Sequence, residues 1–235
     1  MVDKKEDPYR DIAGFYNHEY HAGTGRTHGH QYTDLLARTC PQTGDYVLDI
    51  ACGTGAWLAV AGQQGAGIFG VDISETALKI CKVRLPGAGI CASLGEKLPF
   101  PGRCFDVITC LGSLEHFLDQ EQALQEIRRI ARETARIVIL VPNAGFLTYR
   151  VGLFKGTEQS RVRETIRSID EWRALFDQAG LAVSEMWADL HVINRDWILR
   201  GKWYRIPLRA LQAVMLLIWP LQWQYQVYFL CRLKR

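Results

Sequence analysis

The chain has 235 residues, 48% hydrophobic and 23% charged, which is typical of a globular protein and excludes a disordered or fibrous one. Its net charge of +3 supports neither a nucleic-acid-binding surface nor an acidic tail. The charge is uneven, because residues 190–235 hold eight Lys or Arg and one acid, whereas residues 1–189 hold 20 basic and 24 acidic side chains. We therefore expect a basic C-terminal region.

Seven cysteines without a CxxC pair argue against a disulfide framework or a zinc ribbon and favour a reducing compartment. The first eight residues are charged where a signal peptide would be apolar. The longest apolar stretch, 210–221, is 12 residues long and too short to span a bilayer. These features predict a cytoplasmic protein.

From about residue 45, apolar runs alternate with amphipathic ones, which predicts β-α repeats. The predicted strands are 46–52, 68–73, 89–94, 105–111, 136–141, 181–187 and 226–233. The predicted helices include 54–64, 76–85 with Ser74 as N-cap, 120–132, and 170–179 with Asp170 as N-cap and Gly180 as its stop. This order predicts an open, doubly wound α/β sheet.

Two stretches fall outside the alternation, at 144–169 and 189–224. Both are far longer than ordinary connections between helices and strands. We expect both to be insertions that face a substrate or a partner.

The segment 47–55 reads as a strand that runs into a Gly-rich turn and opens a helix. Such a turn brings backbone close to a ligand, and the free N–H groups of the helix start attract a negative group. The dinucleotide fingerprint requires Gly or Ala at position 58, where this chain has Leu58, so a nicotinamide cofactor is disfavoured.

Segment 47–55 resembles motif I of the class I S-adenosylmethionine-dependent methyltransferases, with Asp49 as its acid, Gly53 and Gly55 as its later glycines, and Ala51 in place of the first. Further family motifs follow in order at 70–74, 98–106, 111–116 and 172–180, so the resemblance covers about residues 45–188. It is closest to the branch that acts on small molecules and lipids, such as ubiquinone and menaquinone precursors.

The resemblance implies a Rossmann-like sheet of seven strands, mostly parallel, with the last strand antiparallel. It also implies an N-terminal helical lid segment at 1–44, a methyltransferase domain at 45–235, and S-adenosylmethionine as cofactor. The residues it implies for the cofactor are Asp49, Gly53 and Gly55 at the methionine end, with Ala51 and Cys52 in the same loop, Asp72 and Ile73 at the ribose and adenine, Ser93 and Leu94 near the adenine, and Leu111 near the sulfonium. Tyr16 or Tyr20 would stack from the lid, and a merely structural N-terminal arm is an equal alternative.

One departure concerns the adenine. In this branch an acid usually stands where this chain has Leu94, so adenine recognition would rest on backbone around Leu94 and on Glu96 nearby.

His116 is the best-placed titratable group for a general base, and a structural role that orients the following helix is an equal alternative. His18, His21, His28 and His30 match no standard zinc pattern, so no metal site is predicted. Cys52 and Cys110 are expected to act as small apolar residues. Signatures of nucleic-acid methyltransferases are missing, so no nucleic-acid partner is predicted.

The C-terminal addition holds 8 of the 25 aromatic residues in its 46 residues, and a helix is predicted between Pro207 and Pro220. Its polar stripe of Arg205, Arg209 and Gln212 leaves the remaining surface apolar. The helix would cap the substrate site, or lie in an anionic membrane interface through 195–224 with Arg195, Arg200 and Lys202, or form an oligomer interface.

The sequence therefore predicts an S-adenosylmethionine-dependent methyltransferase that acts by direct in-line transfer on an apolar or lipid-associated small molecule. We expect it in the cytoplasm, with the inner face of the membrane as a further location. The alternatives are a non-catalytic binding or membrane-attached module with the same fold, and an NAD-dependent oxidoreductase.

Overall fold

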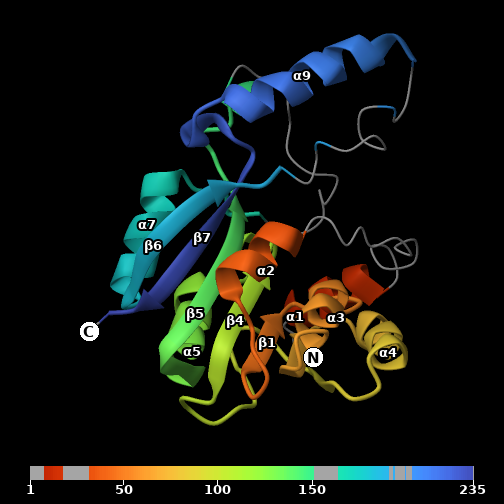
Figure 1. Cartoon of the computed structure of the whole chain (residues 1–235), viewed down its shortest axis with the longest axis vertical. Helices are drawn as coiled ribbons and strands as arrows, with labels where there is room; N and C mark the ends of the chain where they lie inside the picture. Colours follow the sequence, from red (N-terminus) through yellow and green to blue (C-terminus); the bar gives the residue numbers. More distant parts are fainter. Residues whose placement is uncertain are drawn as a thin grey trace, which may run out of the picture.

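The computed structural model describes residues 8–17, 32–150, 164–190, 193, 199 and 203–234. This part of the chain forms one central β-sheet with helices on both of its faces (Figure 1). The histidines at 18, 21, 28 and 30 lie outside the described residues, as do Tyr20, Arg195, Arg200 and Lys202.

The strands of the described residues form a seven-stranded sheet in the order β3-β2-β1-β4-β5-β7-β6. They are β1 (Tyr46–Ile50), β2 (Gly67–Asp72), β3 (Gly89–Ala92), β4 (Phe105–Leu111), β5 (Ala131–Pro142), β6 (Leu181–Ala188) and β7 (Gln226–Leu233). Strand β7 lies between β5 and β6 and is antiparallel to both, whereas the pairs from β3 to β5 are parallel. The predicted sheet, with its last strand antiparallel, is confirmed.

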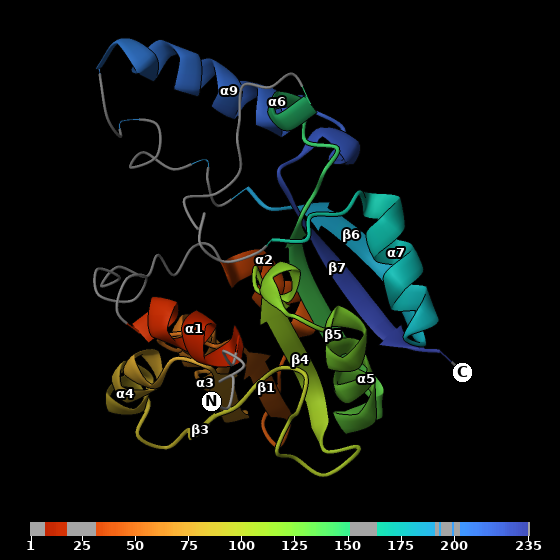
Figure 2. The ribbon, with the colours of Figure 1, turned by 180° about the vertical axis from the view of Figure 1, so that it is seen from behind.

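The described helices are α1 (Pro8–Phe15), α2 (Thr33–Thr39), α3 (Ala56–Gly62), α4 (Glu75–Arg84), α5 (Gln120–Ile130), α6 (Leu147–Arg150), α7 (Ile169–Gln178) and α9 (Ile206–Ile218). Short 3-10 turns are η4 (Leu114–His116), η5 (Trp203–Arg205) and η6 (Leu221–Trp223). Helices α5 and α7 lie together at one side of the sheet, and α1, α3 and α4 gather near β1 (Figure 2).

Alternate strand residues supply two separate cores, because successive side chains of a strand point to opposite faces. Leu48 and Ile108 pack with α5 and α7, whereas Val47 and Val107 pack with α2 and α3. Both faces of β1 and β4 are therefore buried, which explains their nearly continuous apolar sequences.

Several predicted boundaries were wrong, among them the end of the helix expected at 120–132, which stops at Ile130 as α5. Strand β5 begins at Ala131, before the predicted residue 136, because a shift in register lets Ala131 pair with Phe105. The N-cap of α7 is Ser168 in place of Asp170, since Ser168 accepts a hydrogen bond from the Glu171 N–H in a capping box. The Ser74 cap of α4 and the left-handed stop at Gly180 are confirmed.

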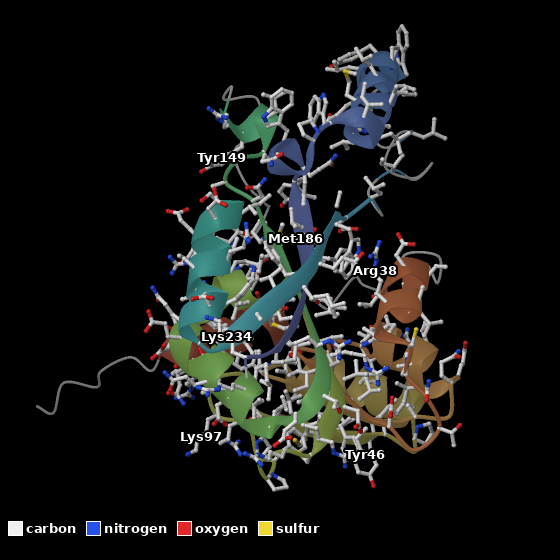
Figure 3. The ribbon with its side chains drawn as sticks, turned by 60° about the vertical axis from the view of Figure 1, so that its left-hand side comes forward. Arg38, Tyr46, Lys97, Tyr149, Met186 and Lys234 are labelled. Atoms are coloured by element: carbon white, nitrogen blue, oxygen red, sulfur yellow. The ribbon has the colours of Figure 1, made fainter. Side chains whose placement is uncertain are left out.

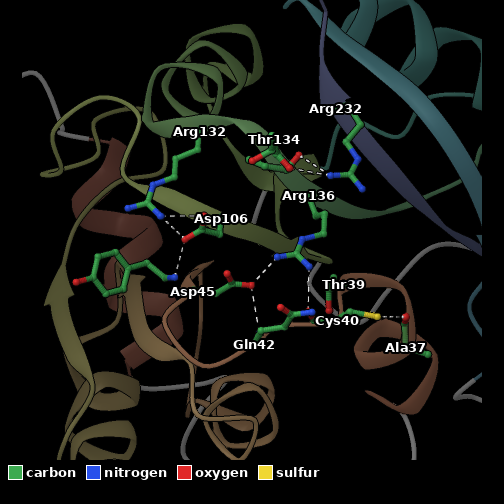
Figure 4. A network of polar contacts seen from close by, with 12 residues as sticks. Ala37, Thr39, Cys40, Gln42, Asp45, Asp106, Arg132, Thr134, Arg136 and Arg232 are labelled. Carbon is green, nitrogen blue, oxygen red and sulfur yellow. Dashed lines mark hydrogen bonds and ion pairs between the residues drawn. The ribbon is translucent and has the colours of Figure 1, made fainter.

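Ion pairs fix the end of the sheet where β1 and β4 begin (Figure 4). Arg132 binds Asp106 at 2.7 Å, and Arg136 binds Asp45 at 2.6 Å. The Asp106 carboxylate also accepts the Tyr46 N–H at 2.9 Å. The opposite end, where the strands terminate, remains available for binding.

Among the described residues, α9 is the most apolar long helix, yet neither it nor any other described helix has the length and apolarity to cross a membrane. It lies at the end of the molecule opposite Tyr46 (Figure 3). The predicted helix between Pro207 and Pro220 is therefore present as α9.

Candidate functional site

A cavity of about 310 Å³ opens at the carboxyl ends of β1, β2 and β4. This is where the strand order reverses between β1 and β4, the usual ligand position in doubly wound sheets. Nine of the eleven predicted cofactor residues line it: Tyr16, Ala51, Cys52, Gly53, Asp72, Ile73, Ser93, Leu94 and Leu111. Its size falls at the small end of typical ligand pockets.

The loop after β1 has a left-handed backbone at Ala51, Gly53 and Gly55, with φ of 58°, 52° and 77°. Ala51 adopts the left-handed conformation although it has a Cβ. The glycine that is usual at this position in the family would adopt it without that steric cost. The loop turns its backbone toward the cavity before α3 begins.

Asp72 joins this loop to the end of β2. Its Oδ2 accepts the Gly53 N–H at 2.8 Å, and its Oδ1 accepts the Ser74 N–H at 2.7 Å. Each carboxylate oxygen can accept more than one hydrogen bond, so the group can also accept hydroxyls from a ligand in the cavity. These residues fit the ribose of S-adenosylmethionine.

Asp49 and Gly55 do not line the cavity, although the sequence assigned both to its methionine end. Asp49 is buried and accepts the Thr109 hydroxyl at 2.6 Å, and burial raises the pKa of its carboxyl from 3.8 to about 7. A Cβ on Gly55 would lie 2.4 Å from the Cys81 Sγ. Both residues therefore support the loop from the side that faces away from the cavity.

Cys52 lines the cavity, and its thiol shares a hydrogen bond with the Cys81 thiol, which together with burial raises the pKa of Cys52. Burial also raises the pKa of Cys110 well above its ordinary value. Both thiols therefore stay protonated and contribute apolar surface.

The segment after β3 has Leu94 at the position where the resemblance places an acid for the adenine. The Ser93 hydroxyl donates to the Lys97 carbonyl at 2.7 Å, and Glu96 Oε1 accepts the Leu118 N–H at 3.0 Å. Leu94 adds an apolar contact to the cavity. Glu96 also lines the cavity, and it lies two residues after Leu94 in the sequence.

Tyr9 and Ile12 of helix α1, and Tyr16 directly after it, line the cavity. Asn17 fastens this segment, because its Oδ1 accepts the Ser74 hydroxyl at 2.8 Å and the Thr76 N–H at 3.1 Å. Sequence reasoning selected only Tyr16 here. The others lie in a short helix without a motif, so the apolar spacing of 9, 12 and 16 was the available signal.

His116 lines the cavity from η4, and its Nε2 lies 3.7 Å from Glu164 Oε1. Burial and the nearby Glu164 raise the pKa of the Glu115 carboxyl from 4.5 to about 8. Glu115 and Glu164 were not predicted as site residues, and Glu164 lies inside the predicted insertion 144–169. Among the described residues, we find no cluster of three side chains able to hold a metal.

Comparisons with known proteins agree with this geometry. Residues 48–139 match the family described as a methyltransferase domain. A stretch of 113 residues is 37% identical to a ubiquinone/menaquinone biosynthesis C-methyltransferase, UbiE, of Burkholderia mallei, and covers 45% of this chain and 46% of that protein. The aligned part thus spans about half the length of the curated relatives that the chain matches.

Solved structures share the fold over nearly the whole chain. The protein bound by the Haloferax volcanii Trm112 methyltransferase activator is 21% identical, with a TM-score of 0.68, over 96% of this chain and 94% of that one. A geranyl diphosphate methyltransferase is 15% identical, with a TM-score of 0.70, over 96% and 98%. Residues 48–139, which hold most of the motif residues gathered around the cavity, thus match a methyltransferase-domain family, and the chain as a whole has the fold of these solved methyltransferases.

Proposed function

We propose that the protein transfers a methyl group from S-adenosylmethionine to an apolar, lipid-associated small molecule. The observation that carries this proposal is the convergence of Asp72, Gly53 and Ser93 on one cavity beside His116. The relatives add weight, since one is named for ubiquinone and menaquinone biosynthesis and a structural neighbour for geranyl diphosphate.

When bound, the cofactor supplies an activated methyl group on a sulfonium. The chain then has to align the acceptor in line with that methyl and keep water out. Backbone of 51–53 and the Asp72 carboxylate hold the donor, and α1 screens it from solvent. His116 takes a proton from the acceptor where the accepting atom still carries one at neutral pH.

An apolar acceptor agrees with the surface of α9. Its buried residues are Ala213 and Leu216, and its two polar residues, Arg209 and Gln212, lie on the same side. The exposed side is apolar instead: Leu208, Leu211, Val214, Leu217 and Ile218 are each more than half exposed. In a helix on a water-exposed surface the apolar side chains face the core and the polar ones face solvent, whereas α9 exposes a row of apolar side chains.

We propose that this face lies in an anionic membrane interface, where it meets a lipid-linked acceptor. Exposed Trp203 and Tyr204 precede the helix, at the boundary where aromatic side chains are favoured. Residues 195–209 hold five basic side chains and one acid, and basic residues near an anionic surface contribute about 1 kcal/mol each. The same helix can cap the acceptor.

Thermal unfolding with S-adenosylhomocysteine tests the donor site, with NADH as comparison ligand. A ligand at a hundred times its Kd adds about 2.7 kcal/mol, which raises Tm by roughly 5 to 10 °C at this chain length. A rise with S-adenosylhomocysteine alone supports the proposal. An unchanged Tm at saturation favours a non-catalytic module, and a rise with NADH alone favours an oxidoreductase.

Transfer from radiolabelled donor into a cell lipid extract tests the acceptor class. Label in the apolar fraction is expected, and label only in the aqueous fraction of a whole-cell extract would overturn the lipid assignment. Co-sedimentation with liposomes tests the membrane contact: binding should require anionic lipid and weaken with salt. Binding that is indifferent to lipid charge would contradict it.

A further inference from the structure

Asn17, which follows α1, bonds to the start of helix α4. Its Oδ1 accepts the Ser74 hydroxyl at 2.8 Å and the Thr76 N–H at 3.1 Å. The Ser74 hydroxyl oxygen in turn accepts the Ala77 N–H at 3.2 Å. The first N–H groups of a helix have no partner within that helix. Two of these groups in α4 are therefore satisfied by side chains, one from its own N-cap and one from a residue 59 positions away in the sequence.

The same N-cap also bonds to the carboxylate that we propose receives the ribose. The Ser74 N–H donates to Asp72 Oδ1 at 2.7 Å, and Asp72 Oδ2 accepts the Gly53 N–H at 2.8 Å. A continuous series of hydrogen bonds thus runs from Asn17 through Ser74 and Asp72 to the loop after β1. Ser74 is fully buried and Asp72 is 6% exposed, so the middle of this series is shielded from water.

The segment that Asn17 fastens forms one wall of the cavity. Tyr9, Ile12 and Tyr16 recur at helical spacing and line the cavity, whereas Arg10 on another side of α1 is exposed. The loop after β1 and Asp72 line the same cavity from the strand ends. A ligand held by Asp72 would therefore lie between the strand ends and α1.

This wall is packed shallowly on the rest of the molecule. From residue 9 to residue 17 every side chain is half-buried or exposed, and none is buried in the way that Ser74 is. Segments with few buried contacts open locally at a lower free energy than the core does. Helix α1 can therefore move off the cavity while the sheet stays folded, and such a movement must break the Asn17 contacts.

We propose that Asn17 is a positioning residue for α1: its bonds to Ser74 and Thr76, here called the latch, hold α1 over the bound cofactor and slow the release of the donor product. This rests on the proposed function, because it requires the donor beside Asp72. A ligand bonded to Asp72 steadies the carboxylate that Ser74 contacts, so ligand binding and closure of α1 favour each other, as reciprocal coupling requires.

Rapid-mixing measurement of S-adenosylhomocysteine dissociation tests the latch. Asn17→Ala removes the acceptor oxygen, so the dissociation rate constant should rise about fivefold, the scale of losing one helix-capping acceptor. The association rate constant should change less. Asn17→Asp keeps an oxygen at this place and should retain most of the slow release. Equal dissociation rates in wild type and Asn17→Ala would overturn the proposal, as would fast release in Asn17→Asp.

Arg10→Ala is the matched control, because it removes an exposed side chain from the same helix. Its dissociation rate should equal that of wild type. If Arg10→Ala releases the ligand as fast as Asn17→Ala does, the effect belongs to the helical stability of α1 in general, and the latch is contradicted.

Hydrogen exchange gives a second readout that needs no ligand. In free Asn17→Ala, the amides of residues 12–17 should exchange about fivefold faster than in wild type, while those of α7 keep their rates. Faster exchange in both segments would mean a merely structural role. S-adenosylhomocysteine should slow the exchange of residues 12–17 in wild type, and more than it does in Asn17→Ala.

Calorimetric titration with S-adenosylhomocysteine separates the two proposals. Absence of binding to wild type defeats the proposed function, and the exchange rates of the free proteins then still decide whether Asn17 holds α1. Normal binding to wild type, with release and α1 exchange both unchanged in Asn17→Ala, defeats the latch alone.

Discussion

The half of the molecule that we propose binds the cofactor and the half that we propose meets the acceptor are built differently. Residues 46–118 place nearly every cavity residue at a strand end or in the loop that follows it, and their glycines, caps and carboxylates bond to one another. The C-terminal half instead contains the two predicted insertions, 144–169 and 189–224, and presents an apolar helix face on α9. The family match, 48–139, covers mainly the first half. The residues proposed to hold the donor are thus bonded to one another within one stretch of sequence, whereas the region proposed for the acceptor lies mostly outside the family match.

The largest expected effect concerns Glu115 and pH. Its folded pKa of about 8 exceeds the ordinary 4.5, so its contribution to stability is complete below pH 4.5 and is lost as pH rises through 8. The full loss is about 5 kcal/mol as an order of magnitude, from about 1.4 kcal/mol per pKa unit. Urea unfolding between pH 7 and 9 should therefore show a decline that Glu115→Gln largely removes.

Asp49→Asn is the companion variant for this test. The Asp49 pKa is also raised, from 3.8 to about 7, so its contribution declines over a lower range. Between pH 7 and 8 the remaining decline should belong mainly to Glu115. Equal slopes there in wild type and Glu115→Gln would mean that the Glu115 carboxyl is ionised in the folded protein.

The second prediction tests how tightly the loop is packed from behind. Gly55→Ala adds a Cβ at φ 77° and 2.4 Å from Cys81 Sγ, so both backbone strain and overpacking act. We expect a loss of about 2 to 4 kcal/mol in unfolding free energy. Gly44→Ala, at φ 93° with open space around it, isolates the strain and should cost only about 1 kcal/mol. Equal losses of unfolding free energy in the two variants would show that the Cys81 side chain moves aside at little cost.

A third variant, Asp72→Ala, weakens the donor site directly. Removing the carboxylate should lower affinity for S-adenosylhomocysteine by about 1 to 3 kcal/mol, the scale of hydrogen bonds to a charged group. Calorimetry measures this, with Asp106→Ala as control because that carboxylate lies at the other end of the sheet. If Asp72→Ala binds as tightly as wild type, the ribose assignment is wrong.

The smallest effect on stability is expected on α9. Leu211→Ser and Leu217→Ser change side chains that are 57% and 61% exposed, so each should alter unfolding free energy by less than about 0.5 kcal/mol. Together they should nevertheless weaken sedimentation with anionic liposomes. Val83→Ser, at an 84% exposed apolar position on α4, should leave sedimentation unchanged. Equal sedimentation of all three proteins would remove α9 from the membrane contact.

The sheet was predictable because periodicity and caps lie close together in sequence. Ser74 precedes its helix by one residue, and Gly180 ends another. The N-cap of α7 was misplaced because Ser168 and Asp170 are both good caps, and only the reciprocal Glu171 contact distinguishes them. The start of β5 was missed because pairing with β4, which no local pattern encodes, extends the strand back to Ala131.

The site divides in the same way. Residues in motifs, such as Asp72 and Gly53, were found because the chemistry and the turn coincide in sequence. Asp49 and Gly55 belong to the same motif but lie behind the cavity, since the motif records the folding of the loop as well as its ligand contacts. Glu164 is 48 positions from His116, and no periodic or local signal joins them.

The position of β7 has a consequence for how the chain folds during synthesis. Strand β6 forms its hydrogen bonds with β7 and not with β5, so it has no neighbour in the sheet until residues 226–233 have been made. Until then β5 also presents an open edge, and unpaired edges invite association between chains. The donor half can close early on the ribosome, whereas the acceptor half must wait, so nascent chains that stall before β7 should be prone to aggregate.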